Sequence, residues 1–227
     1  MDRPTTPGGR TAVRQGAQTA MEPRGLVDLR GAAGESFTVR YPPGAVVVVS
    51  GLPGSGKSTL LRRWSARSRA AATVDPRAVH EACAAVMPAA LPYAVYRPWA
   101  RIEHFRLLRA SVRRGGPLLV HDCGSRAWMR RWLSGAAARQ GRELHLVLLD
   151  VGAVTALAGQ RERGRWAPRR AFARHRRGLD RLLAAFTRHA AGAAGTPTPE
   201  AASVLLLDRV SRERAAAVRF GPPEPAR

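Results

Sequence analysis

The sequence predicts an α/β fold in which helices lie on both faces of a parallel sheet. Short apolar runs alternate along the chain with longer segments of helical period, which is typical of strand–helix–strand units. The run at 45–50, AVVVVS, is apolar on both faces, as expected of a strand buried inside a parallel sheet. A glycine-rich loop follows this run directly, and helical sequence begins after the loop.

Five strands are expected in this sheet, and at least one helix separates each strand from the next. The strands are expected at 45–50, 72–74, 118–121, 144–149 and 203–207. The helices are expected at 57–69, from residue 76 onward, and at 92–114, 127–139, 154–162, 169–190 and 211–220. A short strand is also expected at 37–40. Right-handed crossovers between parallel strands would make the sheet doubly wound.

The 227 residues suit one sizeable α/β domain, which is expected over residues 35–220. Residues 1–34 are rich in glycine, proline, threonine and arginine and have no hydrophobic period, so they are expected to be disordered. Residues 221–227 are expected to form a flexible tail.

The formal net charge of +22 raises the question of a nucleic-acid partner, because basic surfaces attract phosphate backbones. The arginines, however, are spread over nearly every segment and lack the interleaved aromatic residues on which single-stranded nucleic acids stack. The sequence therefore favours a solvated basic surface over a dedicated nucleic-acid face, and an anionic substrate is compatible with both.

Two cysteines, Cys83 and Cys123, are too few for a disulfide scaffold or for a zinc site on their own. The N-terminal residues contain no apolar segment of a signal peptide, and no apolar run reaches the roughly 20 residues that a membrane-spanning helix needs. The sequence thus predicts a cytoplasmic protein without a membrane partner, and it leaves the oligomeric state open.

Residues 51–58, GLPGSGKS, match the phosphate-loop pattern GxxxxGK[ST] at every fixed position. The match has the required context, because a predicted strand comes before it and a predicted helix after it. Glycines allow the backbone to turn so that its N–H groups converge on phosphate oxygens, and the start of the helix adds its positive dipole end. The sequence therefore predicts an ATP site formed by Gly51, Pro53, Gly54, Ser55, Gly56, Lys57, Ser58 and Thr59.

Lys57 is the only lysine in a chain that otherwise uses arginine for its basic side chains. A compact ammonium group on a flexible stem can reach between the β- and γ-phosphates, whereas a planar guanidinium is bulkier and does not fit inside the loop. Lys57 is therefore expected to act on the transferred phosphoryl group. The hydroxyl of Ser58 is expected to bind Mg²⁺.

Four further segments carry a resemblance to a known group of proteins: 73–77 (TVDPR), 118–124 (LLVHDCG), 124–126 (GSR) and 160–165 (QRERGR). Over residues 45–210 the chain resembles the small P-loop kinases, nearest to the polynucleotide-kinase and zeta-toxin-like ATP-binding group. The resemblance implies a three-layer P-loop NTPase with an Arg-rich lid and the strand order 2-3-1-4-5, where strand 1 precedes the loop. It also implies ATP and Mg²⁺ as cofactors.

Two aspartates receive roles from this resemblance. In the group, an aspartate at the end of the second strand is the base for the acceptor hydroxyl, and Asp75 matches that position. Asp75 precedes Pro76, so helix capping is the alternative role. Asp122 would hold the water shell of Mg²⁺ opposite Ser58, and Asp150, which ends another predicted strand, competes for that role.

The segment 160–165 resembles the lid that follows the fourth strand in these kinases, and the resemblance implies that Arg161 and Arg165 close over the phosphates. A solvated, arginine-rich helix end is the alternative interpretation. At 124–126 the resemblance implies an arginine directed toward the acceptor. His121 is interpreted as a packed strand residue.

These observations predict an ATP-dependent phosphotransferase that moves the γ-phosphoryl group of ATP to a hydroxyl acceptor. One alternative is a regulatory nucleotide-binding ATPase without a small-molecule acceptor, and another is a basic nucleic-acid-binding protein. The identity of the acceptor stays open. Aromatic and histidine residues of one helical segment are expected to shape its pocket, with plain core packing as the alternative: Tyr93, Tyr96, Trp99, His104 and Phe105.

Overall fold

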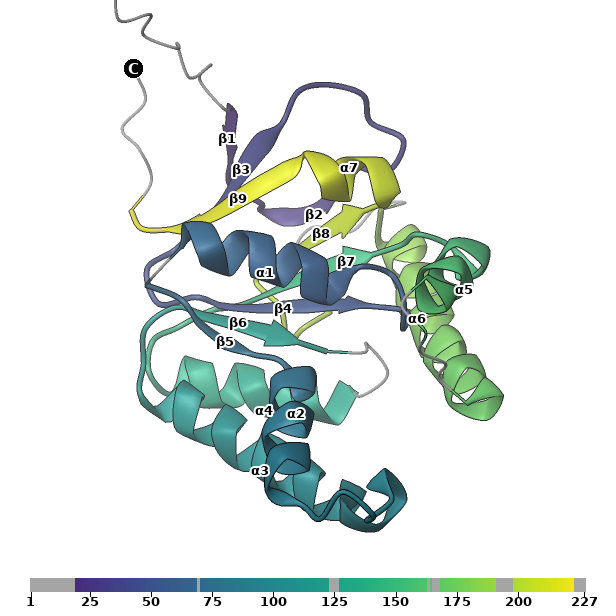
Figure 1. Cartoon of the computed structure of the whole chain (residues 1–227). Coiled ribbons are helices and arrows are strands. Elements are labelled where there is room, and N and C mark those ends of the chain that lie inside the picture. The colour runs from purple at the N-terminus through teal and green to yellow at the C-terminus, as the bar shows by residue number, and fades with distance from the viewer. Residues whose placement is uncertain are drawn as a thin grey trace, which may run out of the picture.

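A computed structural model of the protein describes residues 19–68, 70–122, 127–162, 164, 168–190 and 198–222. Figure 1 shows a central sheet with helices on both sides and a smaller sheet at one end. The strands are β1 (Thr19–Met21), β2 (Gly25–Asp28), β3 (Phe37–Tyr41), β4 (Val46–Gly51), β5 (Ala72–Val74), β6 (Leu118–His121), β7 (Leu144–Leu149), β8 (Ser203–Leu207) and β9 (Ala215–Phe220). The helices are α1 (Lys57–Arg67), α2 (Pro76–Val86), α3 (Tyr93–Arg113), α4 (Ala127–Ala138), α5 (Ala153–Arg161), α6 (Arg169–Ala190) and α7 (Arg209–Arg214). Within the described part of the chain, none of the helices has the length and apolar character needed to span a membrane.

The central sheet has the strand order β2-β8-β7-β4-β6-β5, and all of its paired strands are parallel. Strand β4 lies in the interior of this sheet, with Val46 paired to Leu118 of β6 and to Leu144 of β7. The order β5-β6-β4-β7-β8 is the predicted order 2-3-1-4-5, counted along the chain from β4. The predicted fold class is confirmed, and β2 adds a further strand at one edge.

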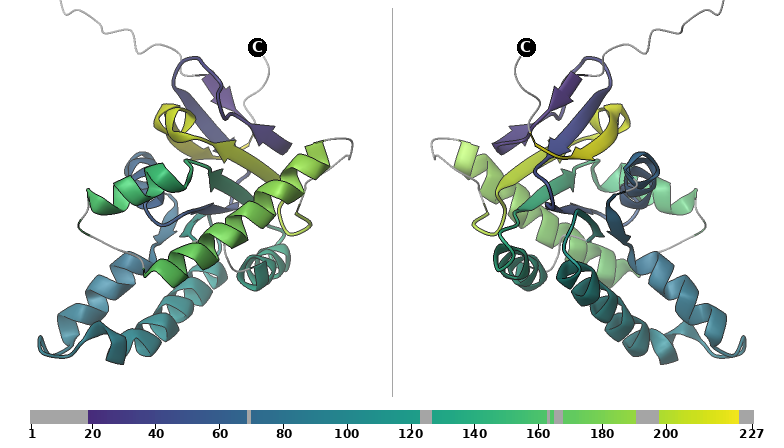
Figure 2. Two further views of the ribbon diagram at one scale, coloured as in Figure 1. Left: turned by 90° about the vertical axis from the view of Figure 1, so that its right-hand side faces the viewer. Right: turned by 90° about the vertical axis from the view of Figure 1, so that its left-hand side faces the viewer.

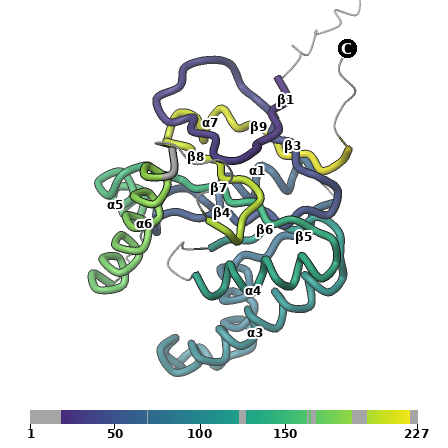
Figure 3. The backbone as a smooth tube through the Cα atoms, turned by 180° about the vertical axis from the view of Figure 1, so that it is seen from behind, coloured from purple at the N-terminus to yellow at the C-terminus, as the bar shows by residue number. Residues whose placement is uncertain are grey.

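The side chains of β4 alternate between two apolar cores, because neighbouring residues of a strand point to opposite faces of the sheet. Val46 and Val48 belong to the first core, which α3, α4 and α6 cover (Figure 3). Val47 and Val49 belong to the second core, which α1, β3 and β9 cover. The protein therefore has the layered arrangement expected for this fold class.

The C-terminal segment differs from the predicted helix over 211–220. Helix α7 ends at Arg214, and residues 215–220 form β9, which pairs in parallel with β3. Alanine favours helices, but β9 packs against α1, where Nε1 of Trp64 donates to the carbonyl of Ala215 over 2.9 Å. Burial of Val218 in the second core also favours the strand. Tertiary contacts therefore override the local helix propensity.

The prediction that residues 1–34 are disordered is wrong for residues 19–34. Strand β1 pairs with β3, and β2 pairs with β8 at the edge of the central sheet. Figure 2 shows the first and last strands together at one end of the protein. The loop after β2 is also held by α7, because Arg214 donates to the carbonyls of Ala32 and Glu35 over 2.6 and 3.0 Å. Residues 1–18 and most of the predicted tail, 223–227, lie outside the described residues.

The N-terminal strand β2 should contribute measurably to stability. Val27 is half-buried and packs against the second core, so we expect Val27→Asp to lower the free energy of unfolding by about 1–3 kcal/mol. Exposed Ala33 in the following loop provides the matched control, because Ala33→Asp adds the same charge without burying it. Urea unfolding followed by circular dichroism measures both variants. Equal stability of the two variants would show that β2 does not pack in the folded domain.

Candidate active site

The phosphate-loop motif forms the turn between β4 and α1, at the carboxyl end of the central strand (Figure 1). Three of its glycines have positive φ values, which are 149° at Gly51, 93° at Gly54 and 92° at Gly56. A Cβ at Gly51 would lie 2.8 Å from the carbonyl oxygen of Leu149, and a Cβ at Gly54 would collide with the carbonyl of Ala156. Other side chains would therefore be strained or blocked in this turn.

Lys57 begins α1, and only 4% of its surface is exposed. Its ammonium group donates to the carbonyls of Gly51 and Leu52 over 2.9 and 2.8 Å, so the side chain folds back over the loop. The hydroxyl of Ser55 is also buried in the loop and has no hydrogen-bond partner among the described residues. A buried cation, a buried hydroxyl and the positive end of a helix together fit a phosphate group.

Two later helices hold the loop in place. Gln160 of α5 is buried and donates from Nε2 to the carbonyl of Pro53 over 3.0 Å. Arg212 of α7 donates from Nη1 to the carbonyl of Ser55 over 2.7 Å, and its guanidinium lies where a side chain at position 56 would have to be. Sequence reasoning missed both contacts, because Gln160 was assigned to the lid and no motif marks Arg212.

Asp75 precedes α2 and contacts the phosphate loop. Its Oδ1 accepts a hydrogen bond from the backbone N–H of Arg77 over 2.9 Å, so Asp75 caps the helix. The same oxygen lies 3.0 Å from Nδ1 of His121, which the sequence suggested was only a packed strand residue. Burial alone would raise the pKa of Asp75, but hydrogen bonds from His121, Arg77 and the hydroxyl of Ser58 hold this pKa well below its usual range. Asp75 is therefore an ionised carboxylate at the loop.

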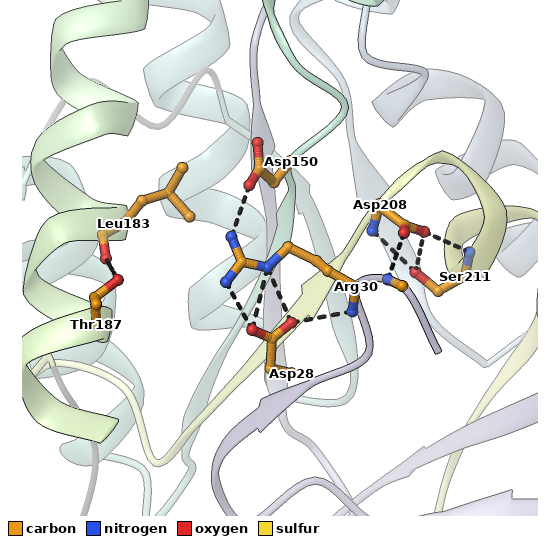
Figure 4. Close-up of polar contacts among 8 residues, drawn as sticks. Asp28, Arg30, Asp150, Leu183, Thr187, Asp208 and Ser211 are labelled. Atoms are coloured by element: carbon orange, nitrogen blue, oxygen red, sulfur yellow. Dashed lines mark hydrogen bonds and ion pairs between the residues drawn. The ribbon is translucent and has the colours of Figure 1, made fainter. Parts of the chain in front are cut away.

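The two candidates for the magnesium role have different partners. Asp122 follows β6, is buried, and accepts a hydrogen bond from the hydroxyl of Ser50 over 3.1 Å. Asp150 follows β7 and instead pairs with Arg30, whose Nη1 lies 2.8 Å from Oδ2 (Figure 4). Arg30 also pairs with Asp28 at 2.6 Å, so one guanidinium neutralises two carboxylates. This geometry favours Asp122 over Asp150 as a metal ligand.

Ser58 and Asp122 fit a magnesium ion by their chemistry. Mg²⁺ takes oxygen ligands, and in phosphate sites one or two protein groups commonly hold it while phosphates and waters complete its shell. Among the residues that the structure describes, no cluster of three or more histidine, cysteine or acidic side chains could hold a metal ion. In such a site the phosphates of a bound nucleotide would supply further oxygen ligands.

Two arginines of the predicted lid lie outside the described residues. Arg161 ends α5 and is exposed, whereas Arg163 and Arg165 are not among the residues described. The segment 124–126, for which the resemblance implies an arginine near the acceptor, lies outside them as well. The roles of Arg161 and Arg165 therefore stay predictions.

The segment expected to shape an acceptor pocket divides between core and cavity. Tyr96 is buried with Val79 and Cys83 in a small core between α2 and α3. A cavity of about 400 Å³ lies between α2, α3 and α4, and Pro76, the residue after Asp75, lines it. Of the five expected residues, Trp99 does not line this cavity. Three of them do, and these are Tyr93, His104 and Phe105.

Substitution of Lys57 by arginine tests whether the loop requires a compact ammonium group. The buried Nζ fits between two loop carbonyls, where a guanidinium needs more room, so Lys57→Arg should lose nearly as much ATP affinity as Lys57→Ala. Titration with a fluorescent ATP analogue measures the affinity, and thermal unfolding checks that both variants fold. Near-wild-type affinity of the arginine variant would contradict the argument from geometry.

Comparison with solved structures finds folds with similar architecture, and no curated protein matches the chain. One is a structure of the PezAT chromosomal toxin–antitoxin system of Streptococcus pneumoniae, with 14% identity and a TM-score of 0.42 over 60% of this chain and only 58% of its own. The tunicamycin resistance protein of Deinococcus radiodurans is 17% identical, with a TM-score of 0.46 over 79% of this chain and 99% of its own. A gluconokinase from Sinorhizobium meliloti 1021 is 18% identical, with a TM-score of 0.45 over 78% and 91% of the two chains. With TM-scores this low, the assignment of the family rests on the protein-family comparison alone.

A protein-family model described as an AAA domain matches residues 46–189. The match covers more than half of the chain and contains the phosphate loop, Asp75, Asp122 and four of the strands of the central sheet. The buried lysine and the glycine turn agree with nucleotide binding at this loop. The chain therefore belongs to this AAA-domain family, and its phosphate loop is that of a P-loop NTPase.

Proposed function

We propose that the protein transfers the γ-phosphoryl group of ATP to a hydroxyl group of an acceptor molecule. The observation that carries this proposal is the position of Asp75, an ionised carboxylate that contacts Ser58 of the loop and lines with it a pocket of about 330 Å³. The next residue, Pro76, lines the cavity between α2, α3 and α4. A nucleotide-binding ATPase that acts on water needs no second cavity beside such a carboxylate. The proposal includes the cytoplasmic location predicted from the sequence.

The phosphates of ATP would lie in the loop. Its backbone N–H groups would bind phosphate oxygens, and the ammonium group of Lys57 would exchange its carbonyl partners for the β- and γ-phosphates. Ser58 and Asp122 would hold Mg²⁺, which when bound supplies positive charge to the phosphate oxygens. Arg161 and Arg165 would add positive charge around the transferred group, as the resemblance to small kinases implies.

In the transfer step, the acceptor oxygen forms a bond to the γ-phosphorus while the bond from that phosphorus to the β–γ bridging oxygen breaks. ADP leaves with the bridging oxygen, and the proton of the acceptor hydroxyl passes to the carboxylate of Asp75. Because the pKa of Asp75 is held low, this carboxylate is ionised at neutral pH and can orient the hydroxyl before transfer. His121 is a positioning residue, since its Nδ1 fixes Oδ1 of Asp75.

The variant Asp75→Asn separates the two roles of this residue. Asparagine caps helices as well as aspartate does, so the variant should still fold, with a small fall in melting temperature from the lost charged contact with His121. ATP affinity should survive, because the loop supplies it. Transfer to the acceptor should fall by about 10²–10⁴-fold, the usual weight of general-base catalysis. All three quantities are measured on one protein sample. The acceptor comes from a screen of hydroxyl compounds and 5′-hydroxyl oligonucleotides with labelled ATP.

The same experiment distinguishes the alternative functions. Unchanged transfer by Asp75→Asn would leave Asp75 as a helix cap only. ATP hydrolysis without transfer to any compound of the screen would favour a regulatory ATPase. Nucleic-acid binding that falls steeply with salt, in the absence of transfer, would favour a basic nucleic-acid-binding protein.

The assignment of the magnesium role to Asp122 predicts different effects for two aspartates. Asp122→Asn should raise the Mg²⁺ concentration needed for activity and slow both transfer and background ATP hydrolysis, because it removes a negative charge at the loop. Asp150→Asn is the matched control, since Asp150 pairs with Arg30 and Arg30 keeps Asp28 as a partner. Rates measured over a series of Mg²⁺ concentrations check both variants. The opposite ranking would assign the metal to Asp150.

A further inference from the structure

The cavity between α2, α3 and α4 has the size of a small-molecule site. Its volume is about 400 Å³, and ligand pockets commonly measure about 300–1,000 Å³. The three helices lie together on one side of the central sheet (Figure 1). Pro76, the residue after Asp75, lines this cavity, whereas the carboxylate of Asp75 itself lines a second pocket together with Ser58. A cavity of this volume can hold a single small molecule.

Aromatic side chains from all three helices line this cavity. His80 of α2 and Tyr93 of α3 are in edge contact, with ring centroids 4.4 Å apart. Phe105 of α3 and Trp128 of α4 form a second contact at 6.3 Å. Tyr93 and Trp128 are 44% and 51% exposed, although burial of such large rings is normally favourable. Exposed rings around a cavity are a surface on which a flat ring can stack.

The charged residues of the cavity are basic. Arg101 and Arg106 of α3 line it, and none of its described lining residues is acidic. Arg106 also pairs with Glu103 on the same helix, at 3.3 Å. The exposed guanidinium of Arg101 can bind a carboxylate or phosphate through two parallel hydrogen bonds. A ligand with a negative group therefore complements this cavity better than a neutral one.

We propose that the acceptor is a small hydroxyl compound that carries a flat aromatic ring and an anionic group. Its ring stacks on the aromatic side chains of the cavity, its anion pairs with Arg101, and its hydroxyl faces Asp75. This inference rests on the proposed phosphoryl transfer, in which the hydroxyl oxygen bonds to the γ-phosphorus, ADP leaves and Asp75 takes the proton. It adds the chemical class of the acceptor.

Four simple compounds test the proposal. One carries all three groups, and each of the other three lacks one of them. They are 4-(hydroxymethyl)benzoate, benzyl alcohol without the anion, trans-4-(hydroxymethyl)cyclohexanecarboxylate without the flat ring, and 4-methylbenzoate without the hydroxyl. Binding to the full-length protein without ATP is measured by ligand-observed NMR. We expect the first compound and 4-methylbenzoate to bind at least about tenfold more tightly than the other two. With ATP, only 4-(hydroxymethyl)benzoate of the two tight binders should become phosphorylated.

Two variants of the cavity and two matched controls connect this binding to named side chains. Trp128→Leu should weaken binding of 4-(hydroxymethyl)benzoate about tenfold, and Arg101→Gln should remove the preference for it over benzyl alcohol. Trp99→Leu and Arg97→Gln are the controls, because both residues are exposed on α3 and neither lines the cavity. ATP affinity should be unchanged in all four variants, which also shows that they fold.

The outcomes separate this inference from the proposed function. Selective binding of the two aromatic acids, without transfer to any hydroxyl compound, would support the cavity's specificity and overturn the phosphotransferase. Transfer to hydroxyl compounds without preference for a ring or an anion would support the phosphotransferase and overturn the inference about its acceptor. Equal weakening by Trp99→Leu and Trp128→Leu, or no binding of the aromatic acids at millimolar concentration, would also overturn it.

Discussion

The burial of strand β4 on both faces is the constraint on which the candidate site depends. All six residues of this strand are buried, and the parallel pairing of its neighbours fixes where each of them ends. The backbone N–H of Asp122 donates to the carbonyl of Val49 over 3.0 Å, which brings Asp122 to Ser50 and to the start of the loop. Strand β5 pairs with β6 in the same way and brings Asp75 to His121. Segments distant in sequence thus meet at the carboxyl ends of the parallel strands, where ligands of such folds bind.

The parts of the fold that the sequence predicts well have a local signal. Four of the five strands of the predicted order are short apolar runs that are buried on both faces, and such runs can be recognised from the local sequence alone. The phosphate loop has fixed spacing, and its glycines are required by the turn itself. Asp75 and Asp122 directly follow predicted strands, so the sequence places them at strand ends. It does not identify the groups that their carboxylates contact.

The parts that sequence reasoning missed depend on contacts between distant segments. Strand β2 has a weak pattern by itself and is ordered by β8, while β9 carries an alanine run that favours a helix until α1 and β3 are present. The side chains that hold the phosphate loop also act over long distances in the sequence. Gln160 and Arg212 lie 107 and 157 residues after the carbonyls to which they donate. No local pattern marks a side chain whose function is to hold a distant backbone carbonyl.

Hydrogen bonds from arginines to distant backbone carbonyls explain part of the excess of arginine. Arg142 donates to the carbonyls of Gly44 and Val112 over 2.6 and 3.0 Å, and Arg67 donates to the carbonyl of Ala216 over 2.9 Å. One guanidinium has five donors in a fixed plane, so it can hold several carbonyls of loops and strand ends at once. Part of the net charge of +22 therefore lies in contacts that stabilise the fold and does not form a surface for nucleic acid.

Lys57 makes the same kind of contact with two carbonyls of its own loop, yet its chemistry differs from that of the arginines. An arginine that holds carbonyls in a planar fork suits a permanent support, because several hydrogen bonds must break before it can move. A phosphate loop needs a cation that holds the loop together without ligand and then turns toward the phosphates. The ammonium of lysine has rotatable donors on a flexible stem and can do both. The one lysine of the chain thus stands where its charge must change partners.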